Sequence, residues 1–162
     1  MQESVQIYYG EGKGKTAASL GFAIKCASAG KSAVIIQFLK GKGVDDEYGI
    51  LQRLEPEIRV FRFEKAKERF ADLSEEQQEE EKINIRNALN YAKKVLSTGE
   101  CELVVLDEVL GLIDEGVATC EEIIQILGCR NDSTEVILTG WRLPKELRAV
   151  ADAIYKVDEE KA

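Results

Sequence analysis

The chain has 162 residues, of which 44% are hydrophobic and 32% are charged, and its formal net charge is −8. This size and composition are typical of one globular domain, which we place at residues 1–157, followed by an acidic tail at 158–162. The negative charge disfavours binding to nucleic acid or to an anionic membrane surface. The sequence contains no histidine, which excludes Ser-His-Asp and Cys-His catalysis and most zinc sites.

The sequence also shows no sign of membrane insertion or secretion. No apolar run approaches the roughly 20 residues of a membrane span, and residues 1–4 lack the basic start of a signal peptide. We therefore expect a cytoplasmic protein. Its cysteines form no C-x-x-C pair, and we expect all of them to be reduced thiols: Cys26, Cys101, Cys120 and Cys129.

Residues 10–16 read Gly-Glu-Gly-Lys-Gly-Lys-Thr and join a strand-like run at 5–9 to a segment with helical periodicity. Strand, glycine-rich turn and helix are the setting of a phosphate-binding loop, in which backbone N–H groups and the helix N-terminus converge on an oxyanion. The predicted nucleotide-binding residues are Gly10, Glu11, Gly12, Lys13, Gly14, Lys15, Thr16 and Ala17. We expect Lys15 to be partly exposed and to reach the outer phosphates, and the Thr16 hydroxyl to bind Mg²⁺.

The spacing of this loop departs from the common pattern. Gly10 and Gly14 enclose three residues, where four are usual. The alternative interpretation is a surface turn rich in glycine and lysine. Because Gly-Lys-Thr falls at the junction of strand and helix, we favour the phosphate-binding loop.

The segment after the loop is predicted to be a helix that ends near Gly30, followed by a buried strand at 32–38. The predicted packing face of the helix consists of Ala17, Leu20, Gly21, Ile24, Ala27 and Ser28. Lys40 and Lys42 then lie in a basic, glycine-rich stretch, which is either a second phosphate contact or a solvated loop. Residues 45–54 are expected to form a short helix or a mobile segment.

The middle of the chain contains one edge strand and one long helix. Alternating apolar and basic residues predict the strand at 58–63, and the charged stretch at 64–72 is expected to be a loop. A capping box at 74–77 begins the helix, which we expect to run to about Ser97. The glutamates at 79–81 are expected to lie on its solvated face.

An apolar strand at 102–106 ends in the carboxylates Asp107 and Glu108. In phosphate-loop proteins a carboxylate in this place orders the Mg²⁺ shell opposite the loop hydroxyl, and a second acid often polarises water or positions substrate. We therefore predict that Thr16, Asp107 and Glu108 surround the metal ion, and that Lys15 and Glu108 take part in catalysis. The alternative for the two acids is a cap at the end of the strand.

The rest of the chain continues the alternation of helix and strand. A second capping box at 119–122 opens a helix that ends at Gly128, and a buried strand at 135–139 precedes Trp141 and Arg142. A short helix with Pro144 at its first position and a strand at 152–157 follow. This order predicts an α/β fold with a doubly wound, mainly parallel sheet of about six strands, with the loop, the two acids and residues 139–142 at its carboxyl edge, where they can converge on one crevice.

These motifs together resemble the ATP:corrinoid adenosyltransferases of the phosphate-loop class. The residues that carry the resemblance are 10–16, Gln-Phe-Leu-Lys-Gly at 37–41, 103–108, Leu-Thr-Gly at 138–140 and Ala-Asp at 151–152. The resemblance implies a P-loop NTPase-like (RecA-like) fold. It also implies transfer of the 5′-deoxyadenosyl group of ATP to the cobalt of a reduced corrinoid, such as cob(I)alamin or cob(I)yrinic acid a,c-diamide, with release of triphosphate.

By the same resemblance, ATP and a corrinoid are the small-molecule substrates and Mg²⁺ is the cofactor, shared by Thr16 and Asp107 or Glu108. The family's Phe-Thr-Trp segment before the long helix is missing, and Trp141 stands where the family has Arg. Two other functions stay open: an ATPase or kinase that acts at the γ-phosphate, and a nucleotide-dependent binding or regulatory protein. A homodimer is one assembly that we consider.

Overall fold

The computed structural model describes residues 4–40 and 47–161. Its centre is a six-stranded sheet in the order β3-β2-β4-β5-β1-β6, and every pair of neighbouring strands is parallel. The strands are β1 (Val5–Tyr9), β2 (Ala33–Gln37), β3 (Ile58–Phe61), β4 (Leu103–Asp107), β5 (Glu135–Gly140) and β6 (Ala153–Lys156). The α/β doubly wound fold predicted from the sequence is therefore confirmed, and β3 lies at the predicted edge.

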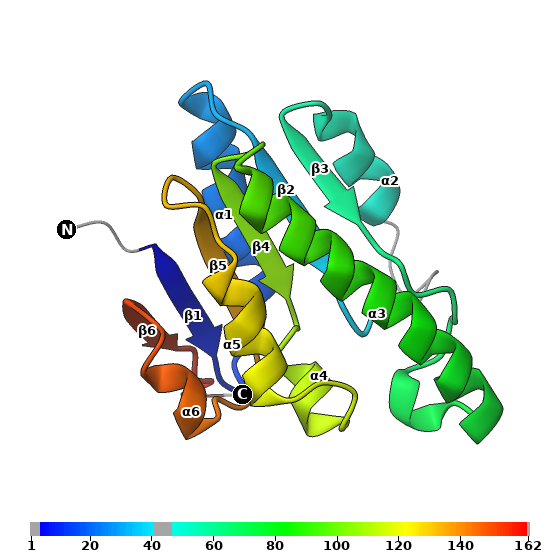
Figure 1. Cartoon of the computed structure of the whole chain (residues 1–162). Helices are drawn as coiled ribbons and strands as arrows, with labels where there is room; N and C mark the ends of the chain where they lie inside the picture. Colours follow the sequence, from blue (N-terminus) through cyan, green and yellow to red (C-terminus); the bar gives the residue numbers. More distant parts are fainter. Residues whose placement is uncertain (1–3, 41–46, 162) are drawn as a thin grey trace.

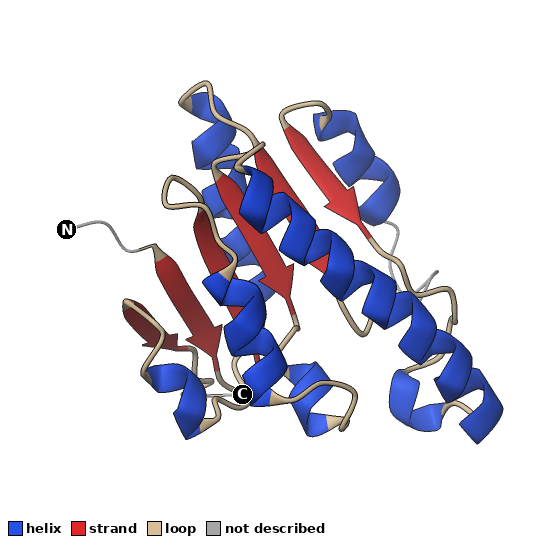
Figure 2. Ribbon diagram, viewed as in Figure 1, coloured by secondary structure: helices blue, strands red, loops and turns tan. Residues whose placement is uncertain are grey.

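Helices cover both faces of this sheet. Figure 1 shows α3 and α5 on the near face and α1 on the far face, and Figure 2 shows the same layers coloured by secondary structure. The helices are α1 (Lys15–Ser28), α2 (Glu47–Leu51), α3 (Glu75–Thr98), α4 (Gly111–Asp114), α5 (Cys120–Gly128) and α6 (Lys145–Arg148), with 3₁₀ turns at Gln52–Leu54 and Phe70–Asp72. The predicted loop at 64–72 therefore contains one short turn of helix.

Strand β2 shows why the sheet needs both layers. All five of its residues are buried, and its side chains alternate between two cores. Val34 and Ile36 pack on the side of α3 and α5, whereas Ala33 and Ile35 pack on the side of α1. Burying a valine or isoleucine side chain stabilises the fold by about 1.5–3 kcal/mol. A parallel strand with two apolar faces can only be stable between two layers of helices.

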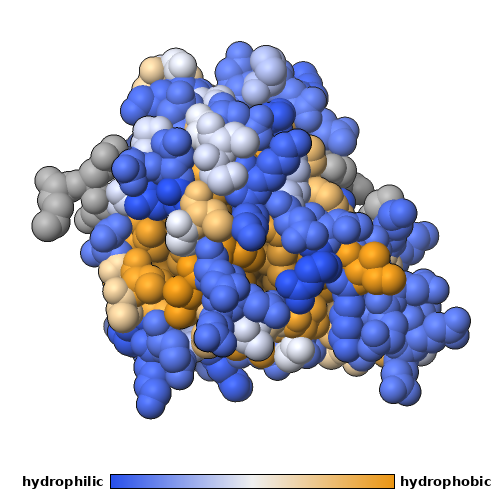
Figure 3. All heavy atoms as spheres, viewed as in Figure 1, coloured by the Kyte–Doolittle hydropathy of each residue, from blue (hydrophilic) through white to orange (hydrophobic). Residues whose placement is uncertain are grey.

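The long helix α3 begins at the predicted capping box. The Ser74 hydroxyl accepts a hydrogen bond from Gln77 N–H at 3.2 Å, and the Gln77 side chain accepts one from Ser74 N–H at 3.1 Å. Helix α5 has only half of its predicted box: Thr119 accepts from Glu122 N–H at 3.1 Å, while the Glu122 carboxylate pairs with Arg86. The surface over α3 and α5 is largely hydrophilic, with apolar atoms visible between the helices (Figure 3).

The structure corrects the predicted packing face of α1. The buried residues of α1 are Lys15, Ser19 and Ala23, whereas Ile24, predicted to be on the packing face, is 46% exposed. The cause is that Lys15, the first residue of α1, turns its side chain into the loop. Ser19 and Ala23, which follow Lys15 at intervals of four residues, lie on the same side of the helix and therefore face the sheet. Ala17, Gly21 and Ser28 of the predicted face are exposed, while Leu20 and Ala27 are half-buried.

The glutamate run at 79–81 is not entirely solvated. Glu79 and Glu80 are exposed as predicted, but Glu81 is 5% exposed. Its carboxylate accepts hydrogen bonds from the backbone N–H groups of Lys65 and Ala66, at 3.1 and 3.4 Å. Glu81 therefore fastens the segment after β3 to α3, a role that helical periodicity alone does not indicate.

Pro144 is the N-cap of α6 rather than its first helical residue. All four cysteines are free thiols, as predicted. Within residues 4–40 and 47–161, none of the helices has the length and apolar character needed to cross a membrane.

Candidate nucleotide-binding site

The loop at 10–16 lies at the carboxyl edge of the sheet, directly after β1. Gly10 has φ = 130°, and its N–H donates to Gly140 O at 3.1 Å. A Cβ at this position would overlap the carbonyl oxygen of Val157. Only glycine combines this backbone angle with such a close approach of the chain that follows β6. The sequence places glycine here because the loop is packed against two neighbouring strand ends.

Lys15 is enclosed by the loop that precedes it. Its Nζ donates to Gly10 O and Gly12 O, both at 2.7 Å, and the residue is only 7% exposed. The expectation that Lys15 is partly exposed is therefore wrong. The reason is that hydrogen bonds to the loop carbonyls replace those that the ammonium would make to water, so the side chain can be buried inside the loop.

The N–H groups of the loop do not all face one centre. Gly12 N–H donates to Val157 O at 2.8 Å, so Gly12 contributes a carbonyl to Lys15 and not an N–H group to an anion. The N–H groups of Lys15, Thr16 and Ala17, at the start of α1, donate to no acceptor in the described part of the chain. Such groups at a helix N-terminus, together with the helix dipole, favour an anion.

Asp107 ends β4 opposite the start of α1 and is fully buried. Its carboxylate accepts hydrogen bonds from the Thr16 hydroxyl at 3.0 and 3.1 Å and from the Thr139 hydroxyl at 2.7 Å. Lys40 Nζ lies 3.8 Å from the same carboxylate. The structure therefore brings together Thr16 and Asp107, 91 residues apart in the chain, and gives Lys40 a place beside them.

Glu108 follows Asp107 with φ = 64°, an unfavourable angle for a residue with a side chain. Its N–H donates to the Thr139 hydroxyl at 2.8 Å, so Thr139 holds both acids. Burial and the neighbouring Asp107 carboxylate raise the pKa of Glu108, while Lys15 and Lys40 oppose the rise. The sequence predicted that Thr139 lies near the two acids at the end of its strand, but not that its hydroxyl hydrogen-bonds to both residues.

A residue that the sequence did not reveal is Glu64. It is 5% exposed, and its carboxylate accepts a hydrogen bond from Leu39 N–H at 2.7 Å. Leu39 is the second residue after β2 and has φ = 59°. Glu64 therefore holds the turn that leads to Lys40. Burial raises the pKa of Glu64 to about 7, with the bond from Leu39 opposing the rise and Glu81 adding to it.

We expect Glu64→Gln to remove part of the pH dependence of stability. Glu64 has an ordinary pKa of 4.5 and a folded pKa of about 7, so between these values the native state keeps a proton that the unfolded state has lost. The free energy of unfolding of the wild type should therefore fall as pH rises through this window. The variant should unfold with a free energy up to about 3 kcal/mol above the wild type at pH 8 and close to it at pH 4.5.

Urea denaturation at pH 4.5, 6 and 8 measures this difference, with Glu80→Gln as the exposed control that should change little. A difference between Glu64→Gln and the wild type that stays constant across the three pH values would contradict the prediction.

Two cavities flank the loop. The Thr16 cavity, of about 460 Å³, is lined by Gly14, Thr16, Ala17, Leu20, Lys40, Ile50 and Leu51. The Trp141 cavity, of about 660 Å³, is lined by residues that include Glu108, Arg69, Phe70, Trp141 and Arg142. The first cavity borders the loop and the second borders Glu108, and both are large enough for parts of a ligand.

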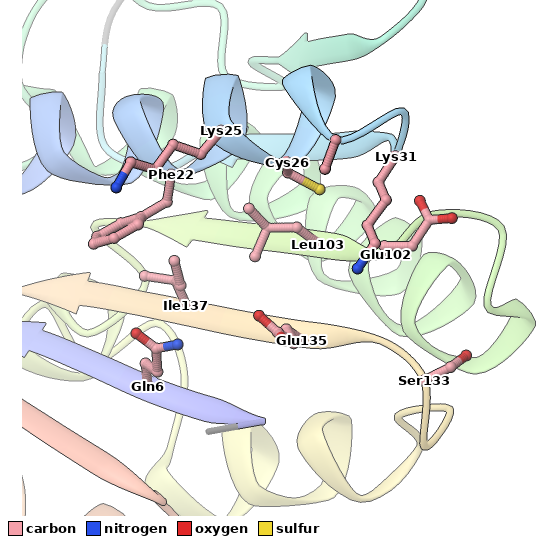
Figure 4. Close-up of a pocket in the computed structure, with 11 residues that line it drawn as sticks. Gln6, Phe22, Lys25, Cys26, Lys31, Glu102, Leu103, Ser133, Glu135 and Ile137 are labelled. Atoms are coloured by element: carbon pink, nitrogen blue, oxygen red, sulfur yellow. The ribbon is translucent and has the colours of Figure 1, made fainter. Parts of the chain in front are cut away.

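A third cavity, of about 250 Å³, opens at the opposite edge of the sheet. Figure 4 shows it between α1 and the strands, with Lys25 and Cys26 on one side and Glu135 on the other. It contains none of the predicted phosphate or metal residues. We therefore assign no part of the nucleotide chemistry to it.

The structure brings some of the predicted site residues together and leaves others apart. The side chains of Lys15, Thr16, Asp107 and Glu108 come together, whereas those of Glu11 and Lys13 are exposed on the outside of the loop. Gly10 and Gly14 shape the backbone, each with a positive φ. Lys42, suggested as a second phosphate contact, lies outside the described residues.

Comparison with known proteins identifies the family to which the chain belongs. The family model described as ATP:corrinoid adenosyltransferase BtuR/CobO/CobP matches residues 1–162. The corrinoid adenosyltransferase of Escherichia coli (strain K12) is 26% identical over 151 residues, which cover 93% of this chain and 74% of that protein. Corrinoid adenosyltransferase CobA of Salmonella typhimurium (strain LT2) is 27% identical over 155 residues, with the same coverage of 93% and 74%. The chain belongs to the ATP:corrinoid adenosyltransferase family.

Proposed function

We propose that this protein transfers the 5′-deoxyadenosyl group of ATP to the cobalt of a reduced corrinoid and releases triphosphate. The observation that carries the proposal is that, in a member of this family, the glycine-rich loop lies beside a hydrogen-bonded Thr16–Asp107 pair whose carboxylate is buried. In the reaction, the cobalt electron pair forms a bond to C5′ of the ribose while the C5′–oxygen bond breaks. The bonding electrons leave with the triphosphate, so no proton needs to be removed.

This chemistry asks the protein for position and charge and not for a strong base. The chain contains no histidine, and its loop supplies the position and the charge that the reaction needs. Lys15 and the N–H groups of Lys15, Thr16 and Ala17 would bind the phosphates and stabilise the charge that builds on the departing triphosphate. Binding energy from the phosphates thereby orients C5′ toward the second substrate.

The residues around Asp107 fit a magnesium ion. The Thr16 hydroxyl and the Asp107 carboxylate are oxygen donors, which Mg²⁺ prefers, and they lie 3.0 Å apart. When bound, the ion would neutralise part of the triphosphate charge. Asp107 would orient the Thr16 hydroxyl, while Thr139 keeps the carboxylate in place. Glu108, half-buried at the rim of the Trp141 cavity, would face the reacting groups.

The two cavities around the loop offer room for both substrates. An ATP held by the loop would place its nucleoside in one of them and leave the other for the corrinoid. Phe70 and Trp141 give the Trp141 cavity aromatic surface, which suits a large planar ligand. The presence of two cavities therefore supports a reaction between ATP and a second large substrate better than hydrolysis of ATP alone.

Product analysis tests the proposal. Chemically reduced cobalamin, Mg-ATP and the protein are mixed, and the expected result is an alkyl-cobalt absorption spectrum together with an equal amount of triphosphate. ADP with phosphate or with a phosphorylated acceptor would instead identify an ATPase or a kinase. Binding of Mg-ATP without either set of products would identify a binding or regulatory protein.

A further inference from the structure

Trp141 directly follows β5 and lies over the loop lysine. The centre of its ring is 5.5 Å from Lys15 Nζ, within the roughly 6 Å at which a cation and an aromatic face attract each other. The backbone beside the indole is fixed to the loop, because Gly140 O accepts from Gly10 N–H at 3.1 Å. A Cβ at Gly140 would overlap the side chain of Leu110, which holds this turn close to the core. The position of Trp141 next to Lys15 is therefore built into the fold.

The indole covers the side of Lys15 that the loop leaves open. An ammonium group has three N–H donors, and Gly10 O and Gly12 O accept two of them at 2.7 Å each. Lys15 is 7% exposed, whereas Trp141 is 55% exposed. The ring thus shields the ammonium from water while it is itself free on its outer face. It can move without disturbing the core.

A phosphoryl oxygen that binds Lys15 needs the donor that the two carbonyls do not use. A hydrogen bond between an ammonium and a phosphate is charge-assisted and short, while a cation–π contact whose ring is exposed to water on its outer face changes an equilibrium by only about two- to fivefold. The phosphate therefore competes successfully with the ring. The Trp141 cavity, about 660 Å³ in volume, lies beside the indole and has room for it.

We propose that Trp141 is a ligand-responsive cover of Lys15, which the terminal phosphoryl group of a polyphosphate displaces from the ammonium. The proposal rests on the phosphate binding that we assign to the loop. Its consequence is that the indole and the phosphate compete for one face of Lys15, so the indole lowers the affinity for polyphosphate. It also means that the neighbouring cavity changes shape when the nucleotide binds.

The test uses the fact that Trp141 is the only tryptophan of the chain, so its emission reports on this side chain alone. Inorganic triphosphate is the probe, with neither adenosine nor corrinoid present. We expect a saturable change in emission of the wild type whose midpoint equals the Kd from calorimetry. Calorimetry should also show that Trp141→Ala binds triphosphate about two- to fivefold more tightly, with Trp141→Phe between the two.

Thermal melting of both variants checks that they are folded. Unchanged emission of the wild type at triphosphate concentrations that calorimetry shows to be saturating would overturn the proposal. Weaker binding by folded Trp141→Ala would also overturn it, because the indole would then be part of the binding surface. Responsive emission without adenosyl transfer would contradict the proposed function alone, and transfer with unresponsive emission would contradict this inference alone.

Discussion

Replacing Lys15 with alanine should lower the affinity for ATP, and the rate of adenosyl transfer, by about 10- to 100-fold. A hydrogen bond to a charged group is worth about 1.5–3 kcal/mol, and 1.4 kcal/mol corresponds to a factor of ten. Lys15 is the cation under the loop, and a transition state with charge on the triphosphate depends on it more than ATP itself does. Calorimetry with Mg-ATP and the initial rate of transfer measure the two effects.

The matched control is Lys13→Ala, which removes the same charge from the exposed side of the loop and should change ATP affinity only a few-fold. Because Lys15 is buried and holds the carbonyls of Gly10 and Gly12, Lys15→Ala should also lower the melting temperature measured without ATP. ATP binding by Lys15→Ala as tight as that of the wild type would rule out the loop as the phosphate site.

Asp107→Asn should raise the Mg²⁺ concentration needed for half-maximal transfer by about tenfold or more. The substitution removes a full negative charge from a buried position where Thr16 and Thr139 donate to it, and Mg²⁺ binds charged oxygen much better than an amide. A Mg²⁺ titration of the transfer rate at saturating ATP gives the midpoint. Some loss of stability is expected as well, since the hydroxyl donors lose a charged partner.

Two further variants sharpen the Mg²⁺ titration. Glu108→Gln should shift the midpoint less than Asp107→Asn. Glu108 lies at the rim of the Trp141 cavity, and within the described residues the Thr16 hydroxyl donates to Asp107 and not to the Glu108 side chain. The matched control is Asp114→Asn. Asp114 is an exposed residue that lines the Trp141 cavity together with Glu108, and its replacement should leave the midpoint unchanged. An unaltered titration for Asp107→Asn would show that Asp107 is not part of the metal shell.

The strong local patterns were sufficient to predict the fold from the sequence. Apolar runs such as 32–38, the capping box at Ser74 and the alternation of strand and helix each depend on residues that are close in the chain. The position of the loop, and of Asp107 at the end of a parallel strand, then follows from the rule that the carboxyl ends of such strands meet at one edge. The sequence therefore predicted which groups meet.

What the sequence could not reveal depends on long-range packing. Glu64 and Leu39 are 25 residues apart, and nothing local to either shows that a buried carboxylate would hold a strained backbone. The burial of Lys15 was missed for a related reason, because periodicity describes the outside of a helix and not a side chain that turns back into its own loop. Thr139 was predicted at the same edge as Asp107, but only the order of the strands, with β5 next to β4, shows that the two residues form a hydrogen bond.

A crystal structure of the protein with magnesium and ATP would test most directly whether the start of α1 is the polyphosphate site. We predict phosphoryl oxygens within hydrogen-bonding distance of Lys15 Nζ and of the N–H groups of Thr16 and Ala17. The metal ion should lie between the phosphates and the Thr16–Asp107 pair. A nucleotide bound elsewhere on the protein, with these N–H groups facing only water, would contradict the phosphate-loop assignment and the proposed function with it.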